Sequence, residues 1–191
     1  MGFFVLTRWK KQELVFQLSN SIRSLFFKGE CGVNVDPSLE FIEFMTITED
    51  ELRNYEPLAG SYAIIQIKHD ILFGFNHFRK RWELPAGRRE LNESPKECAI
   101  RELYEETGQK VEDLTFQGLA KIRNLETQHV KYNPVYFSKI NHLTPFIPND
   151  EMEQMTLWDL TSDIGPFDHV DVQIWKALKH VHDFTTMQQN N

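Results

Sequence analysis

Cysteine is almost absent from this 191-residue sequence, which has only Cys31 and Cys98 and no Cys-x-x-Cys pair. Two cysteines cannot form the disulfide framework of a small secreted domain, and their spacing does not indicate a zinc site. The nine glycines and eight prolines are too few for a collagen-like or low-complexity chain. These scarcities favour a globular protein of the reducing cytoplasm.

Long apolar runs are also missing. No stretch approaches the roughly 18 apolar residues of a membrane-spanning helix, so no membrane partner is expected. The apolar start at residues 3–6 is followed by charged residues from Arg8 onward, which leaves it shorter than the core of a signal peptide. We therefore expect a protein that is neither secreted through such a leader nor embedded in a membrane.

Positive charge is in short supply as well. The lysines and arginines number 21 against 28 aspartates and glutamates, which gives a formal net charge of −7. A chain this acidic is a poor general binder of the phosphate backbone, so bulk nucleic acid is not an expected partner. The length and the 41% of hydrophobic residues predict one domain with a substantial core and a decorated terminus.

The first part of the chain alternates short apolar runs with polar residues, a pattern typical of β-strands. These runs lie at residues 3–6, 14–18, 22–27 and 41–47. Pro57 and Gly60 then mark a boundary. We predict a β-rich accessory segment at 1–57 that helps to form a homodimer, a main domain at 58–185 and a frayed tail at 186–191.

The main domain mixes strand patterns with two helical patterns. Strands are predicted at residues 61–68 and 71–75, which form a hairpin, and at 114–122, 130–137 and 155–159. Ser94 and Glu97 have the spacing of a capping box, and Gly108 is a typical helix stop, so a helix is predicted between them. Apolar residues at helical spacing predict a second, terminal helix: Val170, Ile174, Leu178 and Val181.

The first helix carries an unusual concentration of carboxylates. At about 100° per residue, Glu102, Glu105 and Glu106 share an arc of roughly 100°, where like charges repel. A divalent cation would remove that cost, and oxygen ligands suit Mg²⁺, with Mn²⁺ as the alternative. Because Mg²⁺ usually binds carboxylates together with substrate phosphates, the pattern favours phosphate-ester or pyrophosphate chemistry. The competing interpretation is a solvated acidic face that looks away from the core.

The segment around this helix resembles the Nudix box of the Nudix hydrolases, G-x5-E-x7-R-E-U-x-E-E-x-G-U with U aliphatic. The positions in register are Gly87, Glu93, Arg101, Glu102, Leu103, Glu105, Glu106 and Gly108. One position departs from the pattern, since Gln109 stands where the family has an aliphatic residue. The resemblance implies the α/β Nudix fold, an α/β/α sandwich with a mixed central sheet, here with the N-terminal β-rich extension.

The same resemblance implies roles for the box residues. It assigns metal binding to Glu102, Glu105, Glu106 and the Gly87 carbonyl, and it makes Arg101 the residue that orients the carboxylates. Glu93 would tie down the loop through Arg101. The implied reaction is attack of water on a phosphorus of a nucleoside diphosphate linked to another group, which cleaves the pyrophosphate bond.

The reaction also needs a general base, which family members place either in the box or on a later loop. The sequence offers Asp150, Glu151 and Glu153 on such a loop, with Glu126 as an outsider. We favour Glu153, together with Arg101, Glu102 and Glu105, as the catalytic set. The alternative is a solvated acidic loop without a role in the chemistry.

Residues for substrate recognition are indicated less specifically. Basic residues flank the box on an otherwise acidic chain, and the candidates for binding diphosphate oxygens are Arg79, Arg81 and Arg88. A solubilising basic loop is the alternative. Four aromatic residues could stack on a base, although aromatic residues in strands usually belong to the core: Phe75, Tyr132, Tyr136 and Trp158.

Three functions compete at this point. The first is a metal-dependent hydrolase acting on a small-molecule nucleotide diphosphate, such as a nucleotide sugar, ADP-ribose or a nucleoside triphosphate. The second is a non-catalytic nucleotide sensor that regulates a partner, which would be expected to lose metal-binding carboxylates. The third is an enzyme acting on RNA 5′ ends, which the net charge disfavours. Residues 84–87 resemble ADP-ribose pyrophosphatases, but that group's proline beyond the box is missing from 123–128, so the subgroup stays open.

Overall fold

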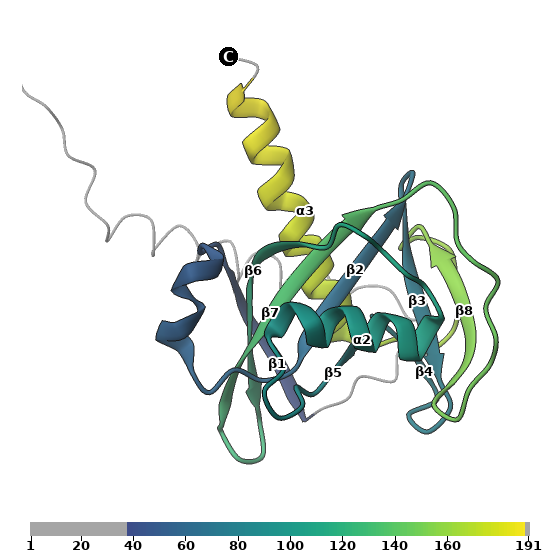
Figure 1. The fold of residues 1–191 in the computed structure, drawn as a ribbon, viewed down its shortest axis with the longest axis horizontal. Helices are drawn as coiled ribbons and strands as arrows, with labels where there is room; N and C mark the ends of the chain where they lie inside the picture. The colour runs from purple at the N-terminus through teal and green to yellow at the C-terminus, as the bar shows by residue number, and fades with distance from the viewer. Residues whose placement is uncertain (1–37, 190–191) are drawn as a thin grey trace, which may run out of the picture. The chain divides into compact units, whose positions relative to one another are not determined.

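The structure is a computed structural model that describes residues 38–189. Strand predictions at 3–6, 14–18 and 22–27 lie outside the described residues. The elements, in chain order, are β1 (Leu39–Met45), the 3-10 helix η1 (Glu49–Tyr55), β2 (Ser61–Ile67), β3 (Asp70–Asn76), β4 (Arg81–Glu83), β5 (Ala86–Gly87), α2 (Pro95–Thr107), β6 (Thr115–Asn124), β7 (Val130–Lys139), β8 (Met152–Trp158) and α3 (His169–Gln189) (Figure 1). The strands predicted from 41–47 onward and both helices are present, with boundaries shifted by a few residues.

The strands form one mixed eight-stranded sheet in the order β1-β6-β7-β2-β3-β4, with β5 paired to β2 and β8 paired to β3. Only the central pair of β2 and β7 is parallel among the described strand pairs, and the others are antiparallel. Parallel neighbours need a long crossover connection, and here α2 is part of it. The sheet is therefore mixed, as the resemblance implied.

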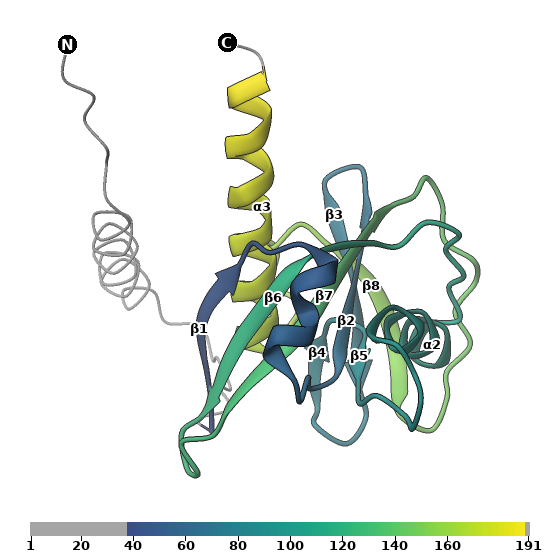
Figure 2. The ribbon, with the colours of Figure 1, turned by 60° about the vertical axis from the view of Figure 1, so that its left-hand side comes forward.

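The two helices cover opposite faces of this sheet (Figure 2). Successive side chains of a strand point to opposite faces, so β2 serves both cores. Ala63 and Ile65 pack with Leu103 of α2, whereas Ile64 packs with Trp175 of α3. This arrangement is the predicted α/β/α sandwich.

Strand β1 is an edge strand of the same sheet. It pairs antiparallel with β6 from Leu39 opposite Asn124 to Met45 opposite Leu119. The 3-10 helix that follows is anchored by the buried Leu52 and by a 2.9 Å hydrogen bond from the Tyr136 hydroxyl to Glu49. The boundary at residue 57 and the accessory segment before it stay predictions, since most of that segment lies outside the described residues.

Neither helix in the described part of the chain combines the length and apolar character that a membrane span requires.

Candidate active site

Helix α2 begins and ends as its sequence predicts. The Glu97 N–H donates to the Ser94 hydroxyl at 3.2 Å, and the Ser94 N–H donates back to the Glu97 carboxylate at 2.8 Å. Gly108 closes the helix in the left-handed region, at a φ of 71°, where glycine carries no Cβ penalty. These caps set where the helix starts and therefore which of its residues face the sheet.

The three glutamates of α2 that were predicted to bind metal differ in exposure. Glu105 is exposed, Glu102 retains 13% of its side-chain exposure and Glu106 is buried. The competing interpretation of a solvated acidic face therefore does not describe Glu102 and Glu106. The reason is β5, which lies against this side of the helix and donates its Ala86 N–H to Glu106 at 3.0 Å.

Gly87 is where β5 comes closest to the carboxylates. A Cβ on Gly87 would lie 2.0 Å from the Glu102 Oε1 atom, so only glycine permits this approach of backbone and carboxylate. The Gly87 carbonyl oxygen accepts a weak hydrogen bond from the Cys98 thiol at 3.4 Å. The Gly87 backbone and the Glu102 carboxylate therefore lie against each other, and the predicted ligand atom of Gly87 is bound by a thiol.

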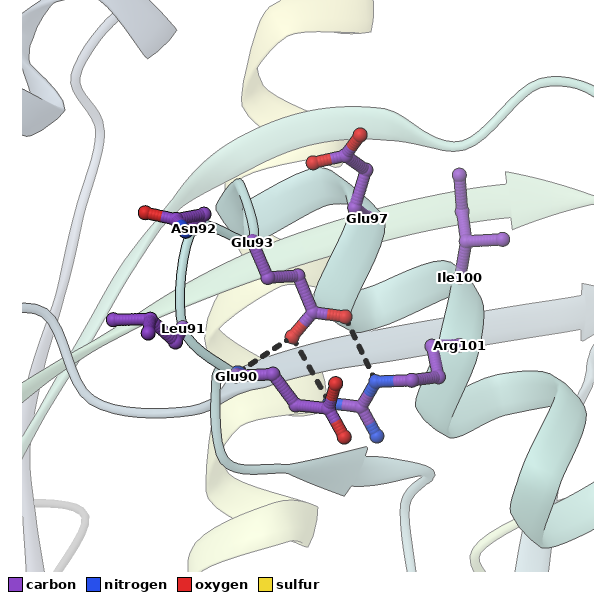
Figure 3. A pocket seen from close by; sticks show the side chains of 7 residues that line it. All are labelled: Glu90, Leu91, Asn92, Glu93, Glu97, Ile100 and Arg101. Atoms are coloured by element: carbon purple, nitrogen blue, oxygen red, sulfur yellow. Dashed lines mark hydrogen bonds and ion pairs between the residues drawn. The ribbon is translucent and has the colours of Figure 1, made fainter.

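Arg101 connects the loop before α2 to the carboxylates on it. Its guanidinium binds both oxygens of Glu93, at 2.8 and 3.0 Å (Figure 3). The same group donates to Glu102 at 2.8 Å and to Glu105 at 2.9 Å. Hydrogen bonds from Arg101 and from the Glu90 N–H lower the pKa of Glu93 to about 2. The prediction that Glu93 ties down the loop through Arg101 is confirmed.

Figure 3 also shows the side chains that line a depression at this loop, Glu93 and Arg101 among them. Leu91 at its rim is 93% exposed. None of the three glutamates of the predicted metal site lines it. The depression is therefore distinct from the carboxylate cluster.

The carboxylates on the inner side of α2 repel one another. Burial raises the pKa of Glu106 well above its ordinary value, and the charges of Glu151, Glu102 and Glu83 raise it further. Burial also raises the pKa of Glu102, against the opposing effect of Arg101, and Glu105 and Glu151 add to the rise. A cation among these oxygens would lower the cost of keeping them charged.

The loop before β8 contributes Glu151 to this cluster, whereas Glu153 has different neighbours. Glu151 accepts a 3.0 Å hydrogen bond from the buried Asn76 amide and lies 3.5 Å from Arg79. Glu153 instead faces His77 at 3.6 Å and Lys80 at 3.8 Å. Strand alternation alone would place residues 151 and 153 on the same side, so the difference arises because Glu151 precedes β8, at the end where the pairing with β3 shifts register between Phe75 and Asn76. Asp150 and Glu126 are exposed.

The amide side chains of Gln109 and Asn149 hold this loop on α2, and the family pattern specifies neither of them. Gln109 is buried and exchanges hydrogen bonds with the backbone of Thr144, at 2.8 and 3.0 Å. Asn149 donates to the Glu105 carbonyl at 2.9 Å, one of the unpaired carbonyls at the helix end. The polar residue at the box's aliphatic position is thus compensated by the loop it binds.

The arginines predicted to bind substrate are engaged differently. Arg79 binds Glu83 at 2.5 Å, and Arg81 binds both Glu83 and Asp168 at 2.7 Å. Both guanidinium groups are thus paired with carboxylates, although the Arg79 side chain is half exposed and only that of Arg81 is mostly buried. Arg88 is exposed. Among the aromatic candidates, Trp158 and Tyr136 are buried in the two cores and Phe75 packs against one of them, whereas Tyr132 packs against Tyr55 at 5.2 Å between ring centroids.

The donor atoms around α2 decide which kind of metal ion this part of the molecule suits. Within residues 38–189, no three His, Cys, Asp or Glu side chains already converge on one ion position. The available donors are nevertheless all oxygen, and Gly87 leaves room for Glu102 to lie against the backbone. Oxygen donors with excess negative charge fit a hard divalent cation and not a soft one.

A family model described as the NUDIX domain matches residues 61–173. The chain belongs to the NUDIX domain family. The matched residues run from β2 to the start of α3 and include the box, α2 and Glu151.

One curated relative of this NUDIX domain is a protein of Lactococcus lactis subsp. cremoris named "Probable DHNTP pyrophosphohydrolase". The two are 36% identical over 104 residues, which is 51% of this chain and 63% of the relative. The chain thus spans less than two thirds of that relative's length.

Solved structures of NUDIX proteins share the fold. The Bacillus subtilis pyrophosphohydrolase BsRppH is 21% identical with a TM-score of 0.57, over 75% of this chain and 90% of the other. The NUDIX domain of Shewanella oneidensis NrtR, in complex with ADP ribose, is 20% identical with a TM-score of 0.54, over 71% and 99%. A MutT NUDIX hydrolase from Burkholderia pseudomallei is 22% identical with a TM-score of 0.53, over 63% and 94%.

Proposed function

We propose that this chain is a metal-dependent NUDIX hydrolase that cleaves the pyrophosphate bond of a nucleoside diphosphate linked to another group. Its substrates would be nucleotide sugars, ADP-ribose-like compounds or nucleoside triphosphates. The observation that carries the proposal is that burial and then the charge of Glu151 raise the pKa of Glu106 and the pKa of Glu102, so two carboxylates are kept where their charged forms are costly. Apolar or neutral side chains at these positions would give a more stable fold. The presence of carboxylates therefore favours a cationic ligand.

The residues that would hold the metal are Glu102, Glu105, Glu106 and the Gly87 carbonyl, with Mg²⁺ as the expected ion and Mn²⁺ as the alternative. A bound divalent metal would lower the pKa of a water molecule that it binds, and it would neutralise negative charge on the phosphate oxygens. Arg101 would orient Glu102 and Glu105, to which it already donates hydrogen bonds. Because Glu93 holds the other edge of the guanidinium, Arg101 keeps this position without substrate.

Glu151 replaces Glu153 as our candidate for the general base. Its carboxylate is near enough to Glu102 and Glu106 to act on their pKa values, and two side chains from the β3–β4 turn hold it. A base must lie within reach of the water it deprotonates, so this position favours Glu151. Glu153, paired with His77 and Lys80, lacks these neighbours.

Phosphate binding would fall to Arg88, which is exposed next to Gly87. Arg79 and Arg81 would act indirectly, since their guanidinium groups are bound to carboxylates. DHNTP joins the candidate substrates because the relative from L. lactis is named for it. We also propose that the protein is cytoplasmic and that residues 1–57 help it to form a homodimer.

The test is a substrate screen with Mg²⁺ and with Mn²⁺ that identifies both products. The panel contains ADP-ribose, nucleotide sugars, nucleoside triphosphates, dinucleoside polyphosphates and DHNTP. We expect hydrolysis of at least one compound and its loss after chelation of divalent metal. Binding of a nucleotide without hydrolysis of any panel compound would overturn the enzyme and favour the non-catalytic sensor.

A further inference from the structure

A series of ion pairs runs from the start of α3 to the loop before β8. Asp168, directly before α3, binds Arg81 at 2.7 Å, and Arg81 binds Glu83 at 2.7 Å. Glu83 is bound in turn by Arg79 at 2.5 Å, and the same guanidinium lies 3.5 Å from Glu151. Each arginine of the series thus lies between two carboxylates. The pairs connect α3 to the proposed general base through β4 and the β3–β4 turn.

The inner part of this series is buried and firmly anchored. The Arg81 and Glu83 side chains retain only 13% and 8% of their exposure. Asp168 also accepts the Val170 N–H at 2.8 Å, which fixes that end on the backbone of α3. Because Arg81 already gives the buried Glu83 a close cationic partner, Glu83 would be paired without Arg79. The bond between Arg79 and Glu83 therefore serves to hold the Arg79 guanidinium in one place.

Arg79 is the member of the series that reaches the surface. Its side chain is 51% exposed, and ion pairs this exposed contribute little to folding stability. Burial alone would lower the pKa of Arg79, but Glu83 raises it and the charge of Glu151 adds to the rise. The charge of Glu106 acts in the same direction. The positive charge of Arg79 is therefore felt at the carboxylates of the proposed site.

The contacts that hold the Glu151 side chain are both made to one of its two oxygens. The Asn76 amide donates to Oε1 at 3.0 Å, and Arg79 Nη1 lies 3.5 Å from the same atom. In the part of the chain that the structure describes, Oε2 has no such partner. The side chain is 44% exposed, so water can reach it. One oxygen is thus fixed from the β3–β4 turn, and the other is left for a ligand.

We propose that Arg79 is a positioning residue that is held by Glu83, fixes Oε1 of Glu151 and so leaves Oε2 as the oxygen that accepts a proton from the attacking water. The inference rests on the proposed function. In that reaction the water oxygen bonds to phosphorus, and the bond from that phosphorus to the bridging oxygen breaks. The leaving phosphate departs with the bonding electrons. Because Arg79 acts through Glu151 and not on the substrate, it affects kcat and not KM.

The test measures kcat and KM of Arg79 variants in two backgrounds, at saturating Mg²⁺ and on a substrate found in the screen. Arg79→Ala should lower kcat about tenfold and change KM less than twofold, because the Glu151 carboxylate is no longer fixed. In the Glu151→Gln background, the same replacement should change kcat less than twofold, since the group through which Arg79 acts is already lost. Arg79→Lys should lower kcat less than threefold, because a single nitrogen of Arg79 makes both contacts.

Arg123→Ala is the matched control. Arg123 is also a partly exposed arginine of this sheet that pairs with a glutamate, Glu40, at 3.2 Å, and it lies outside the series. Its replacement should leave both kcat and KM unchanged. Melting temperatures without metal establish that each variant is folded at the assay temperature.

Three results would overturn the positioning role and leave the proposed function standing. One is a tenfold loss of kcat that persists in the Glu151→Gln background, which would show that Arg79 acts independently of Glu151. Another is a raised KM with an unchanged kcat, which would make Arg79 a substrate-binding residue. The third is an Arg79→Ala variant with the kcat of the wild type. If the wild type hydrolyses no compound of the panel, the proposed function is overturned, and the inference falls with it.

Discussion

The fully buried side chain of Asn76 donates a 3.0 Å hydrogen bond to the carboxylate of Glu151, 75 residues away in sequence. The Asn76 oxygen is itself fixed by the N–H groups of Phe78 and Arg79, both at 3.0 Å. Asn76, the last residue of β3, thus binds the β3–β4 turn through its oxygen and the loop before β8 through its nitrogen, which joins the two segments. Glu151 is therefore held toward α2 before any ligand arrives.

This arrangement predicts different effects for two neighbouring glutamates. Glu151→Gln should lower kcat by about 100-fold, equivalent to about 2.7 kcal/mol of transition-state stabilisation, because the amide cannot accept a proton from water. Glu153→Gln should lower kcat less than threefold, since its carboxylate faces His77 and Lys80. Steady-state kinetics on the substrate found in the screen decide between them. The reverse pattern would restore Glu153 as the base.

Replacement of Glu106 should separate activity from stability. Glu106→Gln keeps an acceptor for the Ala86 N–H but removes a buried charge whose pKa is raised by burial and by neighbouring carboxylates. We expect a loss of roughly 100-fold or more in kcat at saturating Mg²⁺, about 2.7 kcal/mol, because the metal loses an anionic ligand. The metal-free melting temperature should be unchanged or higher.

The control for that variant is Glu97→Gln, on the same helix. Glu97 is exposed and pairs with Ser94 in the capping box, so its replacement should lower the melting temperature slightly and leave kcat nearly intact. An inactive Glu97→Gln beside an active Glu106→Gln would contradict the metal-site interpretation of α2.

Glu93 should contribute to stability at neutral pH and not in acid. Its pKa is lowered to about 2, so its contribution is present above the ordinary carboxyl pKa of about 4.3 and is lost as the pH falls toward 2. Glu93→Gln should lower the free energy of unfolding by about 1 kcal/mol at pH 7 and by less at pH 3. Urea unfolding at both pH values measures this. Glu90→Gln in the same loop is the control. An equal loss of unfolding free energy in Glu90→Gln would show that the effect comes from the loop and not from the ion pair of Glu93 with Arg101.

Asp171 should have the opposite pH dependence. It is buried beside Asp168 and Glu83, and burial followed by those charges raises its pKa well above the ordinary value of about 3.9. Its contribution to stability is therefore present at low pH and lost as the pH rises through the raised pKa. Asp171→Asn keeps the acceptor for the Leu84 N–H and should gain about 1 kcal/mol in unfolding free energy at pH 8 relative to pH 5.

The neighbouring Asp168 provides the contrast for that experiment. Asp168 binds Arg81 at 2.7 Å and accepts the Val170 N–H at 2.8 Å at the start of α3. Asp168→Asn should therefore destabilise the protein at both pH 5 and pH 8. The prediction would be contradicted if Asp168→Asn stabilised the protein or if Asp171→Asn destabilised it at pH 8. Either result would show that Asp168, and not Asp171, is the carboxylate whose charge is costly.

Local chemistry explains what could be predicted without coordinates. The capping box of Ser94 and Glu97 and the left-handed Gly108 lie within a few residues of the backbone groups they satisfy. Helical periodicity likewise placed Glu102, Glu105 and Glu106 on one arc. The apolar and β-branched runs at 61–68 and 71–75 predicted the hairpin of β2 and β3. Features of this kind depend on neighbours in sequence, so the residues themselves determine them.

The sequence by itself determined the elements of this protein, the box that places it among NUDIX domains and the set of acidic residues from which its site is built. The tertiary structure alone decided that β5 buries Glu106, and that the charge of Glu151 rather than that of Glu153 acts on Glu102. It also decided that Arg79 and Arg81 are bound by carboxylates. The physical reason is that pKa values and hydrogen-bond partners depend on contacts between segments distant along the chain, and only the packed sheet brings those segments together.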